Sequence, residues 1–411
     1  MKIRSITYFL DPGWPLNEAK LRQAGDFLSV AQPAFAEAGY EVQTARLATT
    51  PFPQLVPSLD QAELIRLALT LEESASDLGY DYVSLGPALP KYPQSYALIP
   101  AVLAATESVF LAGSLTDGTT TPHSVSLEAV HSCGLVIRQA SEISPDGFAN
   151  LRFAALANVP AGAPFFPAAY HQGETPSFAL ATESADLAVL AFNQAGSLEK
   201  ARRRLIADIE AHARTLENVA GKISIQFELP FGGIDFTLAP FPEQALSFGT
   251  AVELAGAPAV GLHGSLAAAA ILTDALDQAH FRRAGFNGLM LPVLEDAVLA
   301  ARAAQGTLTV KDLLLYSTVC GTGLDTVPLP GDTSAEQLDA VLVDLAALSL
   351  RLDKPLTARL MPIPGKKAGD ATGFDFAYFA NSRILALEAE PLSNFLAGSE
   401  GIPLSHRNHP V

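Results

Sequence analysis

The chain has 411 residues, of which 49% are hydrophobic and 17% charged, and its formal net charge is −17 at pH 7. So apolar a chain can bury a large core, which excludes global disorder. The acidity argues against nucleic acid as a partner, because binding its backbone requires Lys and Arg to neutralise the phosphates.

The N-terminal half predicts strands that alternate with helices. Asn17 is placed to cap a first helix and Gly39 to end it. The apolar segment 178–192 predicts an extended stretch. We expect strands at 3–10, 40–49, 82–85, 109–113 and 151–158, and helices at 17–39, 60–78, 98–106 and 124–141.

The same alternation continues in the C-terminal half and indicates an α/β fold. The short apolar strands lack a two-residue period, which favours strands covered on both faces. We expect one domain over 1–411, with a weak internal boundary that would give halves of about 1–195 and 196–411. We expect helices at 198–219, 244–255, 265–276, 295–305 and 333–350, and strands at 223–229, 289–293, 357–362 and 385–388.

Cysteine usage and the N-terminus bear on localisation. Two cysteines, Cys133 and Cys320, cannot form a disulfide framework and are typical of reduced thiols in the cytoplasm. The first ten residues lack the features of a signal peptide, and no stretch of about 18 uninterrupted apolar residues occurs. We therefore expect a cytoplasmic protein without a membrane partner, and the apolar composition suggests a homo-oligomer.

The segment Cys320-Gly-Thr-Gly-Leu-Asp325 is the first candidate site. A thiol acts as a nucleophile when a nearby base or helix N-terminus lowers its pKa. Gly321 and Gly323 let the chain turn sharply and expose N–H groups to an anion. The alternative is that Cys320 is a small buried hydrophobe beside a turn.

Two histidines are further candidates. His263 lies between Gly261 and Gly264 after an apolar run, which suits a general base or a metal ligand, or else a helix cap. His171 and Glu174 are three residues apart in a Pro-rich loop. That spacing suits two ligands of one metal, an acid/base pair, or a solvated loop.

Carboxylates at the ends of apolar runs complete the set. Asp235 lies in an apolar segment, where a charge is costly unless it is paired, and Glu228 is near it in sequence. Glu295 and Asp296 open a predicted helix, which the helix dipole alone would explain. A divalent metal is a candidate cofactor. The candidate ligands are His171, Glu174, Asp235, Glu295 and Asp296.

Several signatures of known chemistry are missing from the sequence. No Gly-x-Gly-x-x-Gly opens a helix after the first strand, so neither NAD nor another nucleotide is expected as a cofactor. The chain also has no His-Glu-x-x-His, no Cys-x-x-Cys and no Gly-x-Ser-x-Gly.

The order of several blocks gives the chain a family resemblance. It resembles the DUF711 family, also called UPF0210, whose members are uncharacterised. The resemblance runs over nearly the whole chain. Its blocks are Ile3-Arg-Ser-Ile-Thr7, Pro164 to His171, Phe231 to Pro240, Gly261 to Gly264, Gly288 to Asp296, Cys320 to Asp325 and Ala358 to Pro362.

The resemblance implies a fold similar to pyruvate formate-lyase and anaerobic ribonucleotide reductase. These are barrels of ten strands in two antiparallel halves with helices outside. Those enzymes use a glycyl radical and a cysteine. This chain departs from that chemistry, because residues 401–411 lack a radical loop and no two cysteines are adjacent. Phe110 stands where some relatives have a cysteine.

The expected function is an enzyme acting on a small molecule, a non-radical hydrolase, lyase or transferase. Cys320 would be the nucleophile or acid, His263 the base and Asp235 the orienting carboxylate. Residues that would bind the substrate are His171, Glu174, Gly321, Gly323, Asp325 and Glu228. The alternative is a regulatory protein that binds a small molecule without turnover.

Overall fold

A nine-stranded mixed sheet organises the computed structural model, which describes residues 1–120, 122–319 and 321–407. The strands follow the order β10-β11-β7-β4-β3-β2-β1-β8-β9. Their bounds are β1 Lys2–Leu10, β2 Val42–Thr49, β3 Tyr82–Ala88, β4 Val109–Ser114, β7 Phe153–Ala157, β8 Ser177–Glu183, β9 Phe231–Ala239, β10 Gly323–Pro330 and β11 Leu356–Ile363.

The sheet contains three groups of parallel strands. Strands β7, β4, β3, β2 and β1 run in one direction, whereas β8 and β9 on one side and β11 and β10 on the other run in the opposite direction. Isolated bridges join the outer strands to the chain between them, Leu238 of β9 to Leu289 and Asp325 of β10 to Pro292.

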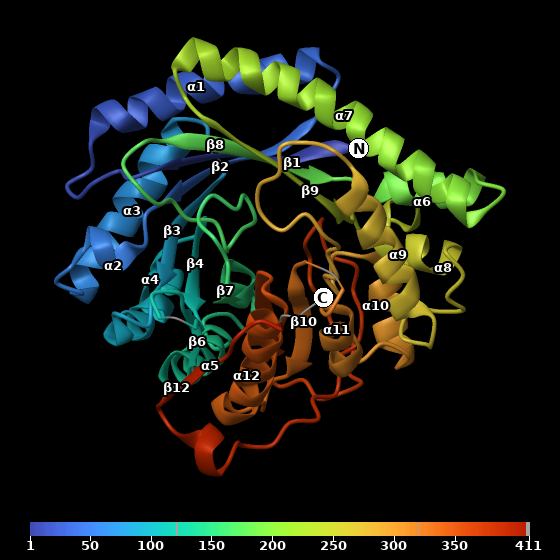
Figure 1. Cartoon of the computed structure of the whole chain (residues 1–411). Helices are drawn as coiled ribbons and strands as arrows, with labels where there is room; N and C mark the ends of the chain where they lie inside the picture. The colour runs from blue at the N-terminus through green and yellow to red at the C-terminus, as the bar shows by residue number, and fades with distance from the viewer. Residues whose placement is uncertain (121, 320, 408–411) are drawn as a thin grey trace.

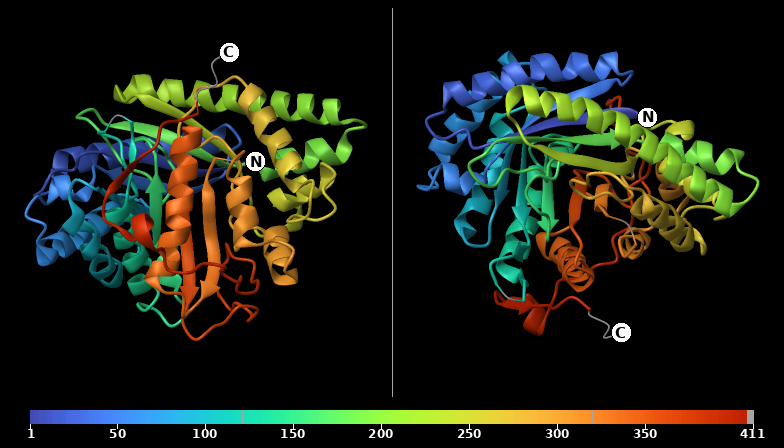
Figure 2. Two further views of the ribbon diagram at one scale, coloured as in Figure 1. Left: turned by 60° about the horizontal axis from the view of Figure 1, so that its bottom comes forward. Right: turned by 45° about the horizontal axis from the view of Figure 1, so that its top comes forward.

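Helices lie outside the curved sheet, with α1 and α7 over β1, β2 and β8 (Figures 1 and 2). A small second sheet joins β5 Thr116–Asp117, β6 Ser124–Ser126 and β12 Gly401–Pro403. The helices are α1 Glu18–Glu37, α2 Phe52–Leu55, α3 Gln61–Asp77, α4 Ile99–Ala105, α5 Leu127–Ala140, α6 Ala185–Gln194, α7 Leu198–Phe227, α8 Phe248–Leu254, α9 Ser265–Gln278, α10 Ala297–Gln305, α11 Val310–Tyr316 and α12 Ala335–Leu352. In the described part, none of them is long and apolar enough to cross a membrane.

Alternation along each strand separates the core from the site. On β2, Ala45 and Leu47 belong to the main hydrophobic core under the helices. Because successive side chains of a strand point to opposite faces, Thr44 and Arg46 project from the other, inner face. The inner face of the sheet therefore carries the polar side chains considered below.

Local sequence signals explain several helix ends. The side chain of Asn17 accepts hydrogen bonds from the backbone N–H groups of Ala19 and Lys20 and so begins α1, as expected. Ser334 and Gln337 form a reciprocal capping box at the start of α12. These caps confirm the predicted helices to within a few residues.

Some predicted elements are wrong. Only the first part of 178–192 is extended, because β8 ends at Glu183 and α6 begins at Ala185. The predicted strand at 223–229 mostly continues α7, whose buried stripe extends to Ile223. Residues 385–388 form no strand.

Two strands of the nine-stranded sheet, β9 and β10, were not predicted, because glycine and proline obscured them. Gly233 of β9 has φ +139°, where the backbone of Arg283 approaches closely. Gly323 begins β10 with φ +94°, and prolines occupy 328 and 330. Such residues usually mark turns, but an outer strand tolerates them.

Candidate functional site

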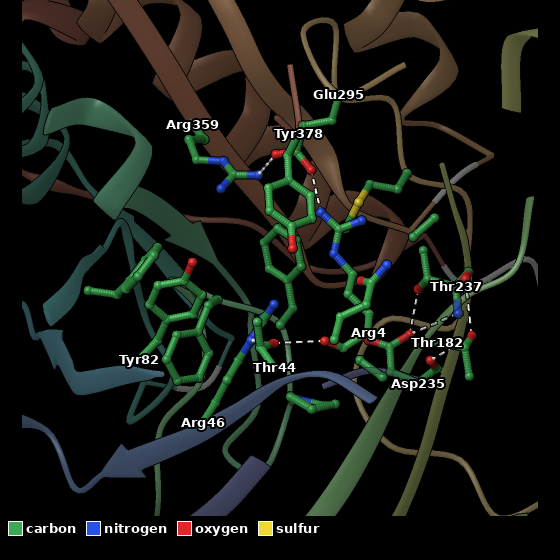
Figure 3. A pocket seen from close by; sticks show the side chains of 18 of the residues that line it. Arg4, Thr44, Arg46, Tyr82, Thr182, Asp235, Thr237, Glu295, Arg359 and Tyr378 are labelled. Atoms are coloured by element: carbon green, nitrogen blue, oxygen red, sulfur yellow. Dashed lines mark hydrogen bonds and ion pairs between the residues drawn. The ribbon is translucent and has the colours of Figure 1, made fainter. Parts of the chain in front are cut away.

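A cavity opens on the inner face of the sheet, with about 820 Å³ of space, part of it open to solvent (Figure 3). Strands β1, β2, β3, β4, β8, β9 and β11 contribute to its walls. Aromatic rings supply much of the apolar lining, and three arginines supply positive charge. The rings belong to Tyr82, Phe110, Phe165, Phe166, Phe376 and Tyr378, and the arginines are Arg4, Arg46 and Arg359.

A buried network of ion pairs lies at one end of the cavity. The guanidinium group of Arg359 on β11 donates to Asp325 Oδ1 at 2.5 Å and to Glu295 Oε1 at 2.8 Å. Glu295 also pairs with Arg4 of β1. With both carboxyl groups ionised, two positive charges face two negative charges, so these four side chains balance one another.

The pKa values of the two acids in the network are shifted in opposite directions. Burial opposes ionisation of Glu295, but the guanidinium groups of Arg359 and Arg4 hold its pKa below the usual value. Burial raises the pKa of Asp325, with Arg359 acting in the opposite direction. Its second oxygen, Oδ2, is buried without a hydrogen-bond partner among the described residues.

Arg46 makes no direct contact with the two acids of this network among the described residues. Its Nε donates to Thr44 Oγ1 at 2.9 Å, but in residues 1–120, 122–319 and 321–407 no hydrogen bond or ion pair engages its terminal nitrogens. The guanidinium group lies 5.1 Å from the centre of the Phe166 ring and 5.9 Å from that of Tyr82. Burial lowers the pKa of Arg46 to about 9, and the positive charges of Arg4 and Arg359 act in the same direction, whereas Tyr82 and Glu295 act in the opposite direction.

Two tyrosines lie near this arginine. Tyr82 comes from β3, and Tyr378 comes from the segment after β11 and faces the same space in Figure 3. The Arg46 guanidinium group lies 5.9 Å from the centre of the Tyr82 ring, and Figure 3 shows Tyr378 beside the same part of the cavity. Neither phenol hydroxyl has a hydrogen-bond partner within the described part of the chain. One cation and two hydroxyl groups therefore converge on one region of the cavity.

Asp235 lies on the opposite wall, on β9, and holds a loop. It accepts hydrogen bonds from the backbone N–H groups of Phe286 at 2.9 Å and Asn287 at 3.0 Å. Thr237 donates to it through both its hydroxyl and its N–H group. Burial raises the pKa of Asp235, while these hydrogen bonds act in the opposite direction. Its carboxylate thus fixes the backbone of the cavity wall.

Gly285→Ala is expected to destabilise the protein by about 2–3 kcal/mol, because two costs combine. Gly285 has φ +71°, and an added Cβ would lie 2.3 Å from Asp235 Oδ2. Chemical denaturation measures the loss. Gly306→Ala is the control, since Gly306 has φ +76° and no atom near its Cβ position. Equal losses in the two variants would contradict the role of Asp235 in holding this loop.

The structure describes two of the three predicted catalytic residues, His263 and Asp235. Cys320 lies outside the described residues. His263 is exposed on the turn before α9 and does not line the cavity. Asp235 does line it. The catalytic roles assigned to these residues from sequence therefore stay predictions.

His171 and Glu174 differ in environment. His171 is buried, burial lowers its pKa, and its Nε2 has no hydrogen-bond partner among the described residues. Glu174 is exposed, and neither residue lines the cavity. Within residues 1–120, 122–319 and 321–407, no group of three or more His, Cys, Asp or Glu side chains is arranged to hold a metal.

The remaining candidates have structural surroundings. Glu228 is exposed at the C-terminus of α7, with φ +51°. Asp296 is the N-cap of α10 and also accepts from Ser247, which confirms the helix-end interpretation. Gly321 is buried near the backbone of Phe286 and Gly288. Gly323 begins β10 beside Thr357.

Sequence reasoning missed the arginines and the tyrosines of the cavity. Arg4 and Arg359 lie in blocks that carried the family resemblance, yet we predicted no role for them. A charged side chain within an apolar strand is costly unless it is paired. That rule drew attention to Asp235, and it applies equally to Arg4, Arg46 and Arg359.

Comparison with known proteins gives the family. The family model described as "Uncharacterised ACR (DUF711)" matches residues 1–381. This chain belongs to the DUF711 family. A UPF0210 protein of Pyrobaculum aerophilum is 33% identical over 81% of this chain and 76% of its own length. One from Acetivibrio thermocellus is 30% identical over 86% of this chain and 81% of its own length. The resemblance inferred from the sequence blocks is confirmed.

Proposed function

We propose that this DUF711 protein binds a small organic anion in the cavity on the inner face of its sheet. The observation that carries the proposal is Arg46, whose charge faces the cavity and has no carboxylate partner among the described residues. Arg4 and Arg359 are already paired with Glu295 and Asp325. An incoming anion therefore meets one guanidinium group that no carboxylate of the described residues contacts.

Energetics support an anion over a neutral ligand. Removing a charge from water is costly, and the cost falls when the charge is paired and hydrogen-bonded. Burial already disfavours the charged form of Arg46 in the unliganded protein. A carboxylate or phosphate group would offset that cost through charge-assisted hydrogen bonds, which planar guanidinium groups form in pairs.

A second candidate function is turnover of the bound anion, and Asp235 is the observation that favours it. A buried carboxyl group with a raised pKa on a cavity wall suits proton transfer. This candidate corresponds to the hydrolase, lyase or transferase reaction expected from the sequence. Binding without turnover corresponds to the regulatory alternative.

We further propose that the sheet closes into a ten-stranded barrel around the cavity. The chain from 288 to 293 would be the tenth strand, between β9 and β10. Leu238 N–H donates to Gly288 O at 3.1 Å, and Val293 N–H donates to Asp325 O at 3.1 Å. Both isolated bridges of this segment are parallel, so it would complete a second group of five strands that oppose the first five.

A ligand screen tests the proposed function. Thermal unfolding of the full chain is followed with anionic, neutral and cationic metabolites of matched size, and stabilisation is expected from anions. Arg46→Met should abolish it, whereas the control Arg22→Met changes an exposed arginine of α1 and should not. Stabilisation only by neutral or cationic compounds, or by none, would overturn the proposal. NMR spectra of each stabilising compound, recorded with wild type and Asp235→Asn, then separate turnover from binding.

A further inference from the structure

We propose that the ligand of the cavity is an aromatic monocarboxylate, held by Arg46 with the hydroxyl groups of Tyr82 and Tyr378. This inference rests on the proposed function and names its ligand class. Three features lead to it: the contacts of Arg46, the donors around it, and the rings that line the cavity (Figure 3).

The contacts of Arg46 favour a monoanion. Arg4 and Arg359 contact Glu295 and Asp325, and the carboxyl group of Asp235 is held by hydrogen bonds from Phe286, Asn287 and Thr237. Among the described residues, Arg46 is therefore the arginine of the cavity that no carboxyl group contacts. A carboxylate carries one negative charge. A phosphate monoester carries about 1.5 to 2 at pH 7, so part of its charge would stay uncompensated in a partly desolvated site.

The donors near Arg46 also match a carboxylate. A guanidinium group presents two parallel N–H groups to the two oxygens of one carboxylate. Tyr82 and Tyr378 line the same part of the cavity, and their hydroxyl groups have no partner in the described part of the chain. A carboxylate can accept about four hydrogen bonds, so it can use the guanidinium group and both hydroxyl groups together.

The walls favour an aromatic body. Arg46 lies against the rings of Phe166 and Tyr82, so a group bound to it brings its body alongside them. Tyr82, Phe110 and Phe166 pack edge to face, with centroid distances of 5.1 and 5.5 Å. Aromatic rings prefer such tilted contacts, and an additional ring can extend the series.

Calorimetric titration of the full chain with four probes tests this class. At pH 8, phenylacetate is expected to bind at least tenfold more tightly than phenylacetamide or phenyl phosphate, and about threefold more tightly than cyclohexylacetate. At pH 5.5, phenyl phosphate is mostly a monoanion, because its second pKa is about 6, and its affinity should approach that of phenylacetate. Tyr378→Phe should weaken phenylacetate about three- to tenfold and phenylacetamide by less, because a charged acceptor forms the stronger hydrogen bond with the lost hydroxyl group.

Each other outcome has a distinct meaning. Tighter binding of phenyl phosphate than phenylacetate at pH 8 would overturn the monocarboxylate and leave the proposed anion site intact. Equal or tighter binding of cyclohexylacetate would overturn the aromatic body. If none of the probes binds while other anions from the metabolite screen do, the inferred class is wrong. If no anion of any kind binds, the proposed function fails with it.

Discussion

Replacing Arg46 with methionine is expected to weaken anion binding at least 100-fold and to stabilise the unliganded protein by about 1–3 kcal/mol. Binding weakens because the variant lacks the guanidinium group that the anion would contact. Stability rises because Arg46 is partly buried and has no carboxylate partner among the described residues, whereas methionine is apolar, shorter and fits beside Phe166 and Tyr82. Opposite effects on binding and stability are typical of a binding residue.

The stabilisation should depend on pH. The folded-state pKa of Arg46 is lowered to about 9 from 12.5, so folding disfavours its charged form. That penalty is present in full below about pH 9 and decreases as pH rises towards the unfolded-state value. The gain from Arg46→Met is therefore expected in full at pH 7 and reduced at pH 10.

Urea denaturation at pH 7 and pH 10 measures this effect, with Arg22→Met as the control on an exposed helix surface. Arg46→Lys keeps a charge but loses the planar pair of donors, and should recover only part of the binding. A less stable Arg46→Met protein at pH 7 would show that the arginine is satisfied without a ligand.

The sequence predicted the α/β class and most helices, because caps and apolar periodicity are local signals. Asn17 and Ser334 begin helices near the expected positions. Strands β9 and β10 were missed, since glycines and prolines that suit outer strands are typical of turns elsewhere. A local pattern does not show whether an extended segment finds a partner strand.

Three residues of the candidate cavity and its surroundings were singled out from the sequence, but their pairings were not. Asp235, Glu295 and Asp325 were singled out, and all three are buried in or beside the cavity. Their partners were not found, because pairing across the sheet joins residues far apart in sequence. Asp325 meets Arg359 only after β10 and β11 align. Conversely, His263 was chosen as a candidate base because of its neighbouring glycines, and these glycines lie in an exposed turn.

Replacing Arg359, which is paired with two carboxylates, should lower the stability of the protein, whereas Arg46→Met should raise it. Arg359→Met is expected to cost about 3–5 kcal/mol, because it leaves Asp325 and one oxygen of Glu295 buried without their cation. Of the two acids, Asp325 should lose more stabilisation, since its Oδ2 already has no hydrogen-bond partner in the described chain. The variant tests whether the network is structural, separately from the ligand charge of Arg46.

The loss should shrink in acid. Burial already raises the pKa of Asp325, and without Arg359 that pKa should rise further. An acid whose folded-state pKa exceeds its unfolded-state pKa destabilises the protein in full above the folded-state pKa. This destabilisation decreases as pH falls through the folded-state pKa. The difference in stability between Arg359→Met and wild type is therefore largest near pH 8 and smaller near pH 5, as urea denaturation at both values would show.

Asp325→Asn added to Arg359→Met should recover part of the stability, because it removes the buried negative charge that has lost its cation. If the loss of stability changes neither with pH nor with Asp325→Asn, packing of Arg359 against Phe165 stabilises this end of the cavity more than charge does. The Cζ atom of Arg359 lies 5.8 Å from the centre of the Phe165 ring.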